Sequence, residues 1–229
     1  MLTKVDRIAT IQEAENLVNE GVSIICVTEL ENPSFNDNRT LSSKDCLGLL
    51  RQVKGTKKCL EIDLERDFMA TIKVDEIDFF QISLRQESLI EENIDKIRAF
   101  SHKIILTDAI ASYEDDPNWI RDRLNIGVTC KLNQLSLLPD VKNSWSFIKN
   151  ECPKFSEELQ VADIAEIVQS FPTLVTMDLK TSDITDICSS LNELAGFYWV
   201  LGEEATHSDK HFTNNLRQIG EFVAALWQR

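Results

Sequence analysis

The chain has 229 residues, of which 43% are hydrophobic, and its 24 basic and 38 acidic residues give a net charge of −14. This length and apolar content suit one α/β domain with a large core. The acidic balance disfavours a nucleic-acid or anionic-membrane partner, because the general field of the protein repels phosphate. No apolar run reaches about 18 residues, so no membrane span is expected.

The first residues, MLTKVDRIATIQEAE, lack the basic-then-apolar pattern of a signal peptide. The six cysteines are widely spaced and form no CxxC pair. Cys26, Cys59 and Cys130 fall within apolar strand patterns, which is typical of buried reduced thiols. A reactive cysteine is the alternative, and it is disfavoured because none stands beside a candidate base. The sequence therefore predicts a cytoplasmic protein.

Strand and helix patterns alternate along the chain. A short first strand is followed by apolar residues at helical spacing, until Gly21 supplies a stop signal. The second strand runs into a long polar loop, and a helix begins after Ser43. Helical patterns follow the other strands, including a short one at 67–73 and the last at 216–226. The eight predicted strands cover residues 5–8, 22–28, 59–64, 78–84, 103–107, 126–132, 174–179 and 197–201.

The region 133–172 permits more than one interpretation. Residues 144–151 and 158–170 have helical patterns, although 158–161 also fits a short strand. Eight βα units whose strands are buried on both faces still predict an α/β fold. The expected architecture is a single (β/α)8 TIM barrel with mostly parallel strands, formed by residues 1–229.

The loop after the second strand carries a resemblance to a known family. The run NPSFNDNRTLS, residues 32–42, resembles the loop after strand two in phosphoribosylanthranilate isomerases, where a proline-containing turn and an arginine precede the helix. The start at Lys4 and Val5, the segment DFFQIS at 78–83 and the final helix are also similar to that family. The resemblance implies the barrel fold. It also implies that Arg39 matches an arginine that contacts the carboxylate of the anthranilate ring.

Two departures from the family argue against its activity. The family uses a general-base cysteine in a KICG-like first strand, but this chain has no cysteine before Cys26. The family binds phosphate with glycine-rich loops after strands seven and eight, whose backbone N–H groups point at the phosphate. Here Glu203 and Glu204 follow Gly202 after the last strand, and two carboxylates oppose a phosphate dianion.

Charged residues at the predicted carboxyl ends of the strands are the candidates for catalysis, because barrel active sites lie there. Lys131 together with Asp63 or Asp178 suits proton transfer or decarboxylation, and Asp6 is a further acid–base candidate. The alternative is that these mixed charges only pair with one another. The anion-binding candidates are Arg39, Arg7 and Lys180, since a guanidinium holds a carboxylate with two hydrogen bonds.

No metal or cofactor is expected. His207 and His211 are four residues apart and share a face if they are helical, but no third ligand is placed by spacing, and a solvated loop is the simpler explanation. The chain contains no GxGxxG, Walker, GxSxG or HExxH motif.

Two functions remain from the sequence. The first is a non-catalytic barrel that binds a partner, expected to be a basic protein, for example as an inhibitor or immunity protein against a basic toxin. It rests on the missing cysteine, the missing phosphate glycines and the charge of −14. The alternative is an isomerase or lyase that acts on a small anionic metabolite at the carboxyl mouth of the barrel.

Overall fold

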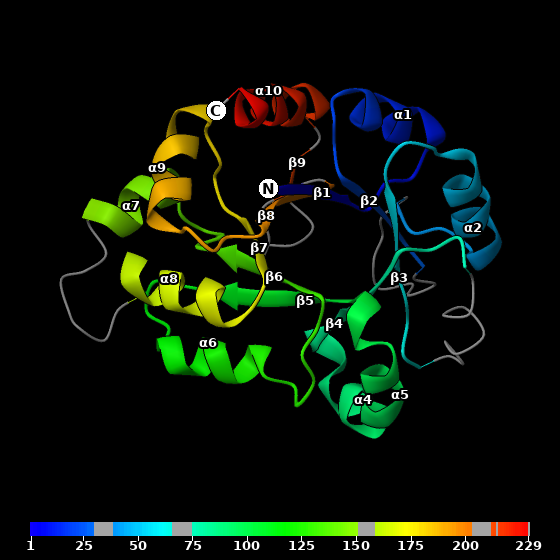
Figure 1. Ribbon diagram of the computed structural model, residues 1–229, viewed down its shortest axis with the longest axis horizontal. Coiled ribbons are helices and arrows are strands. Elements are labelled where there is room, and N and C mark those ends of the chain that lie inside the picture. The colour runs from blue at the N-terminus through cyan, green and yellow to red at the C-terminus, as the bar shows by residue number, and fades with distance from the viewer. Residues whose placement is uncertain (30–38, 66–74, 151–158, 203–211, 214, 229) are drawn as a thin grey trace.

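The structure, a computed structural model, describes residues 1–29, 39–65, 75–150, 159–202, 212–213 and 215–228. Within these residues, eight parallel strands pair in chain order and β1 also pairs with β8, so the sheet closes into a barrel (Figure 1). A short ninth strand pairs with the carboxyl end of β8. The strands are β1 (Leu2–Asp6), β2 (Ile24–Thr28), β3 (Lys57–Glu61), β4 (Phe79–Ser83), β5 (Ile104–Ala111), β6 (Leu132–Leu137), β7 (Thr173–Thr176), β8 (Gly196–Leu201) and β9 (Phe212–Thr213). The expected parallel TIM barrel is confirmed.

Helices form an outer ring around the strands (Figure 1). Their starts follow capping rules: Thr10 accepts a hydrogen bond from the backbone N–H of Glu13, and Ser42 accepts one from that of Asp45. The helices are α1 (Ile11–Asn19), α2 (Ser43–Gln52), α4 (Glu87–Glu92), α5 (Ile94–Ala99), α6 (Pro117–Leu124), α7 (Ser144–Asn150), α8 (Val161–Ser170), α9 (Ile184–Ser190) and α10 (Leu216–Trp227), with 3₁₀ turns η1 (Leu84–Gln86), η2 (Ser101–Lys103) and η3 (Thr181–Asp183). None of the described helices combines the length and the apolar character needed to cross a bilayer.

The alternation of side chains along each strand divides the core into two parts. Outward-facing residues such as Val5, Leu60 and Phe80 pack against the helices in one large cluster. The inward-facing apolar residues form a smaller cluster inside the barrel, made of Ile24, Cys26, Cys59, Ile105, Leu132, Leu174, Tyr198 and Val200. The partly buried Leu2 and Phe79 also pack against this cluster at the amino ends of their strands. Most other inward positions are polar, and they lie mostly toward the carboxyl ends of the strands.

The prediction of the sixth strand at residues 126–132 is wrong. Gly127 lies in a turn with a φ of 75°, and the strand runs from Leu132 to Leu137, with every side chain buried. The apolar residues Ile126 and Val128 only pack against the core from this turn. Residues 144–150 and 161–170 are the helices α7 and α8, and the alternative of a strand near 158–161 is not found in its described part.

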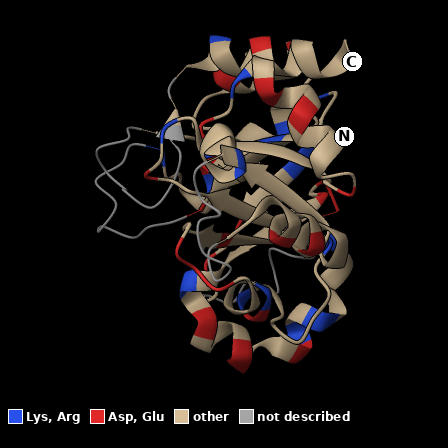
Figure 2. Cartoon of the chain, turned by 90° about the vertical axis from the view of Figure 1, so that its left-hand side faces the viewer, with Lys and Arg blue, Asp and Glu red and all other residues tan. Residues whose placement is uncertain are grey.

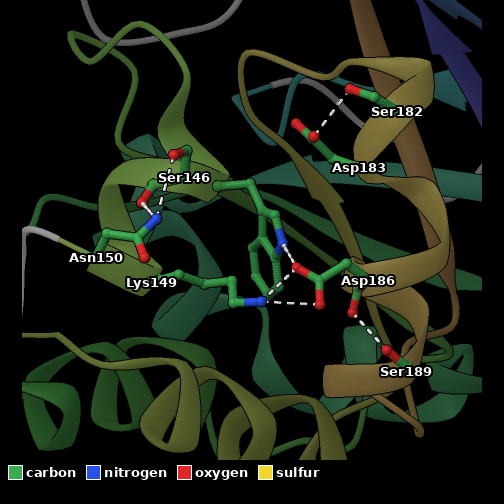
Figure 3. A network of polar contacts seen from close by, with 8 residues as sticks. Ser146, Lys149, Asn150, Ser182, Asp183, Asp186 and Ser189 are labelled. Atoms are coloured by element: carbon green, nitrogen blue, oxygen red, sulfur yellow. Dashed lines mark hydrogen bonds and ion pairs between the residues drawn. The ribbon is translucent and has the colours of Figure 1, made fainter.

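Helices α7 and α9 are joined by a polar cluster on the outer ring (Figure 3). Asp186 accepts hydrogen bonds from Nε1 of Trp145 at 2.6 Å and from Nζ of Lys149 at 2.7 Å. These donors, Lys149 first, lower the pKa of Asp186, so its carboxylate is ionised at neutral pH. The cluster fixes the two helices beside each other without any residue of the barrel mouth.

Closure of the barrel depends on Gly196. This residue begins β8 and pairs with Leu2 of β1. A Cβ at this position would overlap the backbone carbonyl of Leu2, so neither a rotamer change nor a side-chain shift would relieve the contact. Only glycine lets β1 and β8 approach closely here.

We expect Gly196→Ala to destabilise the protein by about 3 kcal/mol, the upper end of the usual range for overpacking, because the obstacle is backbone. Gly48→Ala is the matched control, since a Cβ at Gly48 in α2 meets nothing within 4 Å. The control should stabilise the protein by about 0.5–1 kcal/mol through helix propensity. Urea unfolding measures both changes, and equal stability of the two variants would contradict the close approach of β1 and β8.

Candidate functional site

A buried ion pair lies inside the barrel. Lys4 on β1 donates from Nζ to the carboxylate of Asp6 on the same strand, and to Oε1 of Gln81 on β4 at 2.5 Å. Gln134 on β6 donates from Nε2 to the other oxygen of Asp6 at 2.7 Å. These four side chains belong to residues that are 0–2% exposed. Charged and amide groups therefore join three strands across the barrel.

The ion pair keeps Lys4 charged. Burial by itself would lower the pKa of Lys4, but the Asp6 carboxylate outweighs burial and raises it above its ordinary value of 10.5. Burial, together with the neighbouring Cys59, also raises the pKa of Cys26. Burial raises the pKa of Cys130 to about 12. The thiols of Cys26 and Cys130 stay protonated at neutral pH and are poor nucleophiles.

Further carboxylates are buried at the carboxyl ends of the strands. Glu61, which ends β3, accepts a hydrogen bond from the hydroxyl of Thr28 on β2 at 2.8 Å. Asp108 on β5 accepts one from the hydroxyl of Ser83, which ends β4, and its carboxylate lies 3.8 Å from Nε of Arg85. Glu61 and Asp108 are 8% and 6% exposed. Buried carboxylates therefore lie at the mouth of the barrel, where apolar side chains of similar volume would make the fold more stable.

A bulge in β5 places Asp108. The β5–β6 register passes from Leu106 opposite Asn133 to Ala109 opposite Leu135, so two residues of β5 face one residue of β6. Asp108 lies in this bulge with a φ of 67°, in the left-handed region that non-glycine residues seldom adopt. Its contact with Ser83, whose strand alternation points inward, directs the carboxylate to the inner side of the mouth.

Tyr198 lies near both aspartates. It is on β8, inside the barrel, and 4% exposed. Burial raises its pKa well above the ordinary value, and the charges of Asp6 and Asp108 add to the effect. The two carboxylates therefore act on the same interior region, although they come from strands β1 and β5. The phenol of Tyr198 is neutral, so it adds no negative charge to those of Asp6 and Asp108.

The structure brings three of the predicted site residues together. Asp6 ends β1, and Arg7 follows it with a φ of 65° and 7% exposure. Nη1 of Arg39 donates to the backbone carbonyl of Arg7 at 3.4 Å and to Glu13 at 2.9 Å. Arg39 therefore braces the turn after β1 and forms an ion pair with Glu13 of α1.

The other predicted residues do not converge with Asp6. Asp63, beyond β3, accepts from Nε2 of Gln86 at 2.6 Å, and Asp178, beyond β7, accepts from the backbone N–H of Asn143 at 2.7 Å. Lys180 is exposed at the start of η3. Lys131 immediately precedes β6 and so lies at the amino end of the barrel, away from Asp63 and Asp178.

The sequence did not single out the residues that line the inner mouth. Asp108 follows the predicted fifth strand directly and is one of the charged residues at the carboxyl ends of the strands, but no motif distinguishes it from the others. Gln81, Gln134, Ser136 and Thr176 carry no signal in the sequence, since only strand register shows that they face inward. Several predictions fall on residues outside the described ranges: His207, His211, Glu203, Glu204, the helix at 67–73 and residues 32–38 of the loop.

Solved structures share this architecture over the whole chain. N-(5'-phosphoribosyl)anthranilate isomerase from Pyrococcus furiosus matches with a TM-score of 0.62 at 10% identity, and 100% of both chains is covered. The isomerase from Thermotoga maritima matches with 0.64 at 11% identity and the same coverage. Phospho-2-dehydro-3-deoxyheptonate aldolase from Thermotoga maritima gives 0.58 at 14% identity, with 100% of this chain and 68% of that chain covered.

The fold is a phosphoribosylanthranilate isomerase-like barrel. At these identities the likeness concerns the fold alone. No family model and no curated protein sequence matches the chain.

We expect Lys4→Met to destabilise the protein by about 3–5 kcal/mol, because it leaves the carboxylate of Asp6 buried without its counter-charge. The double variant Lys4→Met/Asp6→Asn should be more stable than Lys4→Met, since the asparagine amide is uncharged and its oxygen still accepts from Gln134. Denaturant unfolding of the wild type, both single variants and the double variant measures the coupling energy. Additive effects would contradict a direct ion pair.

Proposed function

We propose that the carboxyl mouth of the barrel binds a small anionic metabolite and moves a proton on it, as an isomerase or a lyase does. Asp108 carries the proposal: it is a buried carboxylate in a left-handed conformation, placed by a bulge within β5 beside the carboxyl end of β4. Backbone strain of this kind costs about 1–3 kcal/mol and clusters at functional sites. A barrel that served only as a scaffold would be more stable without it.

The roles follow from the contacts at the mouth. Asp108 is the acid–base group, with Ser83 and Arg85 beside its carboxylate. Asp6 is committed to Lys4 and Gln134, so it acts as a fixed charge rather than as a proton carrier. Arg7, at the end of β1, is the anion-binding group, and its turn is braced by Arg39.

The substrate of the resembled family is not proposed for this protein. The first strand lacks the general-base cysteine of the KICG-like run, because the chain has no cysteine before Cys26. Glu203 and Glu204 stand in the region where the family has phosphate-binding glycines. Both differences support a different anionic metabolite and a carboxylate in place of a thiol as the proton carrier.

Solvent isotope exchange tests proton transfer before the product is known. Small keto acids, hydroxy acids and sugar phosphates are incubated with the protein in D₂O, and mass spectrometry detects a deuterium that replaces a C–H proton. We expect exchange in at least one compound. Asp108→Asn should slow it about 100-fold or more, the usual contribution of a positioned acid–base group, without loss of binding. Asparagine tolerates the left-handed backbone, so the fold should survive.

Asp122→Asn is the matched control for the loss of one carboxylate. Asp122 is exposed on α6, on the outer ring, and its replacement should leave exchange unchanged. Equal exchange by wild type and Asp108→Asn would remove Asp108 from the mechanism. Absence of exchange and of binding across the whole panel would contradict the proposed activity.

A non-catalytic barrel that binds a basic protein is the second candidate. The net charge of −14 favours it, and acidic residues lie on several helices of the outer ring (Figure 2). An inhibitor or immunity protein against a basic toxin is one example. Such a protein shows no isotope exchange, and its affinity for the basic partner falls with added salt. Growth of a strain that lacks phosphoribosylanthranilate isomerase, after complementation with this chain, would contradict this second candidate and the exclusion of the family's substrate.

A further inference from the structure

Three neutral polar groups inside the barrel have no hydrogen-bond partner in the described part of the chain: Oε1 of Gln134, the hydroxyl of Ser136 and the hydroxyl of Thr176. Their residues are 0–1% exposed. A buried polar group without a partner costs about 1–3 kcal/mol. Three such groups in one place are costly for the free protein, and each would gain a hydrogen bond from a bound polar group.

Strand register brings these groups to one site. Ser136 on β6 and Thr176 on β7 are direct register partners on neighbouring strands. Leu132 and Leu174 belong to the interior cluster, so alternation along each strand turns Gln134, Ser136 and Thr176 inward as well. Ser136 and Thr176 stand at the carboxyl half of their strands, toward the mouth.

The ion pair determines which atom of Gln134 faces this site. A carboxylate only accepts hydrogen bonds, so the amide nitrogen of Gln134 must be the atom that contacts Asp6 at 2.7 Å. The amide oxygen is then turned away from Asp6. It requires a donor, while each of the two hydroxyls can donate or accept. A ligand with several hydroxyl groups offers a donor to the amide oxygen and a partner to each hydroxyl.

We propose that Gln134, Ser136 and Thr176 form a subsite for the hydroxyl groups of a polyhydroxylated carboxylate. The proposal rests on the anion-binding function proposed for the mouth and specifies its substrate class. A ligand hydroxyl that meets these groups can form the hydrogen bonds that water would otherwise supply. An alkyl chain in the same position would leave all three groups unpaired.

The test compares ligands matched in length. Gluconate, ribonate and glycerate are titrated by calorimetry against the intact protein, with hexanoate, pentanoate and propionate as their counterparts without hydroxyl groups. At least one hydroxylated acid should bind about tenfold or more tightly than its counterpart, the affinity lost when one buried polar group is left unpaired. Equal affinities within every pair would overturn the subsite but leave anion binding intact. Absence of binding by all six would overturn the anion-binding function as well.

Substitutions in the subsite test whether these residues cause the difference in affinity. Thr176→Val and Ser136→Ala each remove an unpartnered hydroxyl, so they should keep the fold and lower the affinity for the hydroxylated acid about tenfold or more. Thr173→Val is the matched control: it makes the same substitution at the amino end of the same strand, where the hydroxyl contacts the carbonyl of Phe171, and it should leave affinity unchanged. Unchanged affinity in both mouth variants, or a crystal structure with gluconate in which only water contacts the three groups, would overturn the proposal.

Discussion

Lys4 places a full positive charge in the centre of the barrel, where an isolated ammonium group would cost several kcal/mol to desolvate. Asp6 neutralises it from two residues away on the same strand, and Gln81 and Gln134 complete the hydrogen bonds from other strands. The interior is therefore apolar toward the amino end, around Leu132 and Leu174, and polar toward the carboxyl end. This division decides which end of the barrel can recognise a polar ligand.

A buried ion pair is weak evidence for stability, because well-packed apolar residues of similar volume often stabilise a core at least as well. The fold also gains no stability from the strained backbone at Arg7 and Asp108, or from the unpartnered hydroxyls of Ser136 and Thr176. Each feature costs free energy. Lys4 lies in the middle of β1, and the other features lie toward the carboxyl ends of the strands. Functional groups on barrels gather at this end, so binding or catalysis gives the features a common reason that folding alone does not.

The barrel could be predicted because apolar strands buried on both faces alternate with helical patterns from Val5 to Leu226. The sixth strand is predicted too early in the chain, because Ile126 and Val128 are typical strand residues, although Gly127 turns the chain between them. The predicted strand places Lys131 at the carboxyl end of the barrel, whereas it lies at the amino end. The site was harder to predict. The partners of Asp6 and Arg39 are distant in sequence, and a bulge rather than local pattern sets Asp108. Register alone reveals that Gln134, Ser136 and Thr176 share one space.

The protonation state of Lys4 tests the central claim most directly, because the charged pair orients Gln134 and keeps the mouth polar. Nitrogen-15 NMR of a lysine-labelled protein, assigned with a Lys4→Arg variant, reports whether the side-chain nitrogen is an ammonium. With its pKa raised above 10.5, Lys4 should remain an ammonium at high pH while exposed lysines titrate. A Lys4 signal that titrates at or below the pH of the exposed lysines would contradict a charged pair inside the barrel.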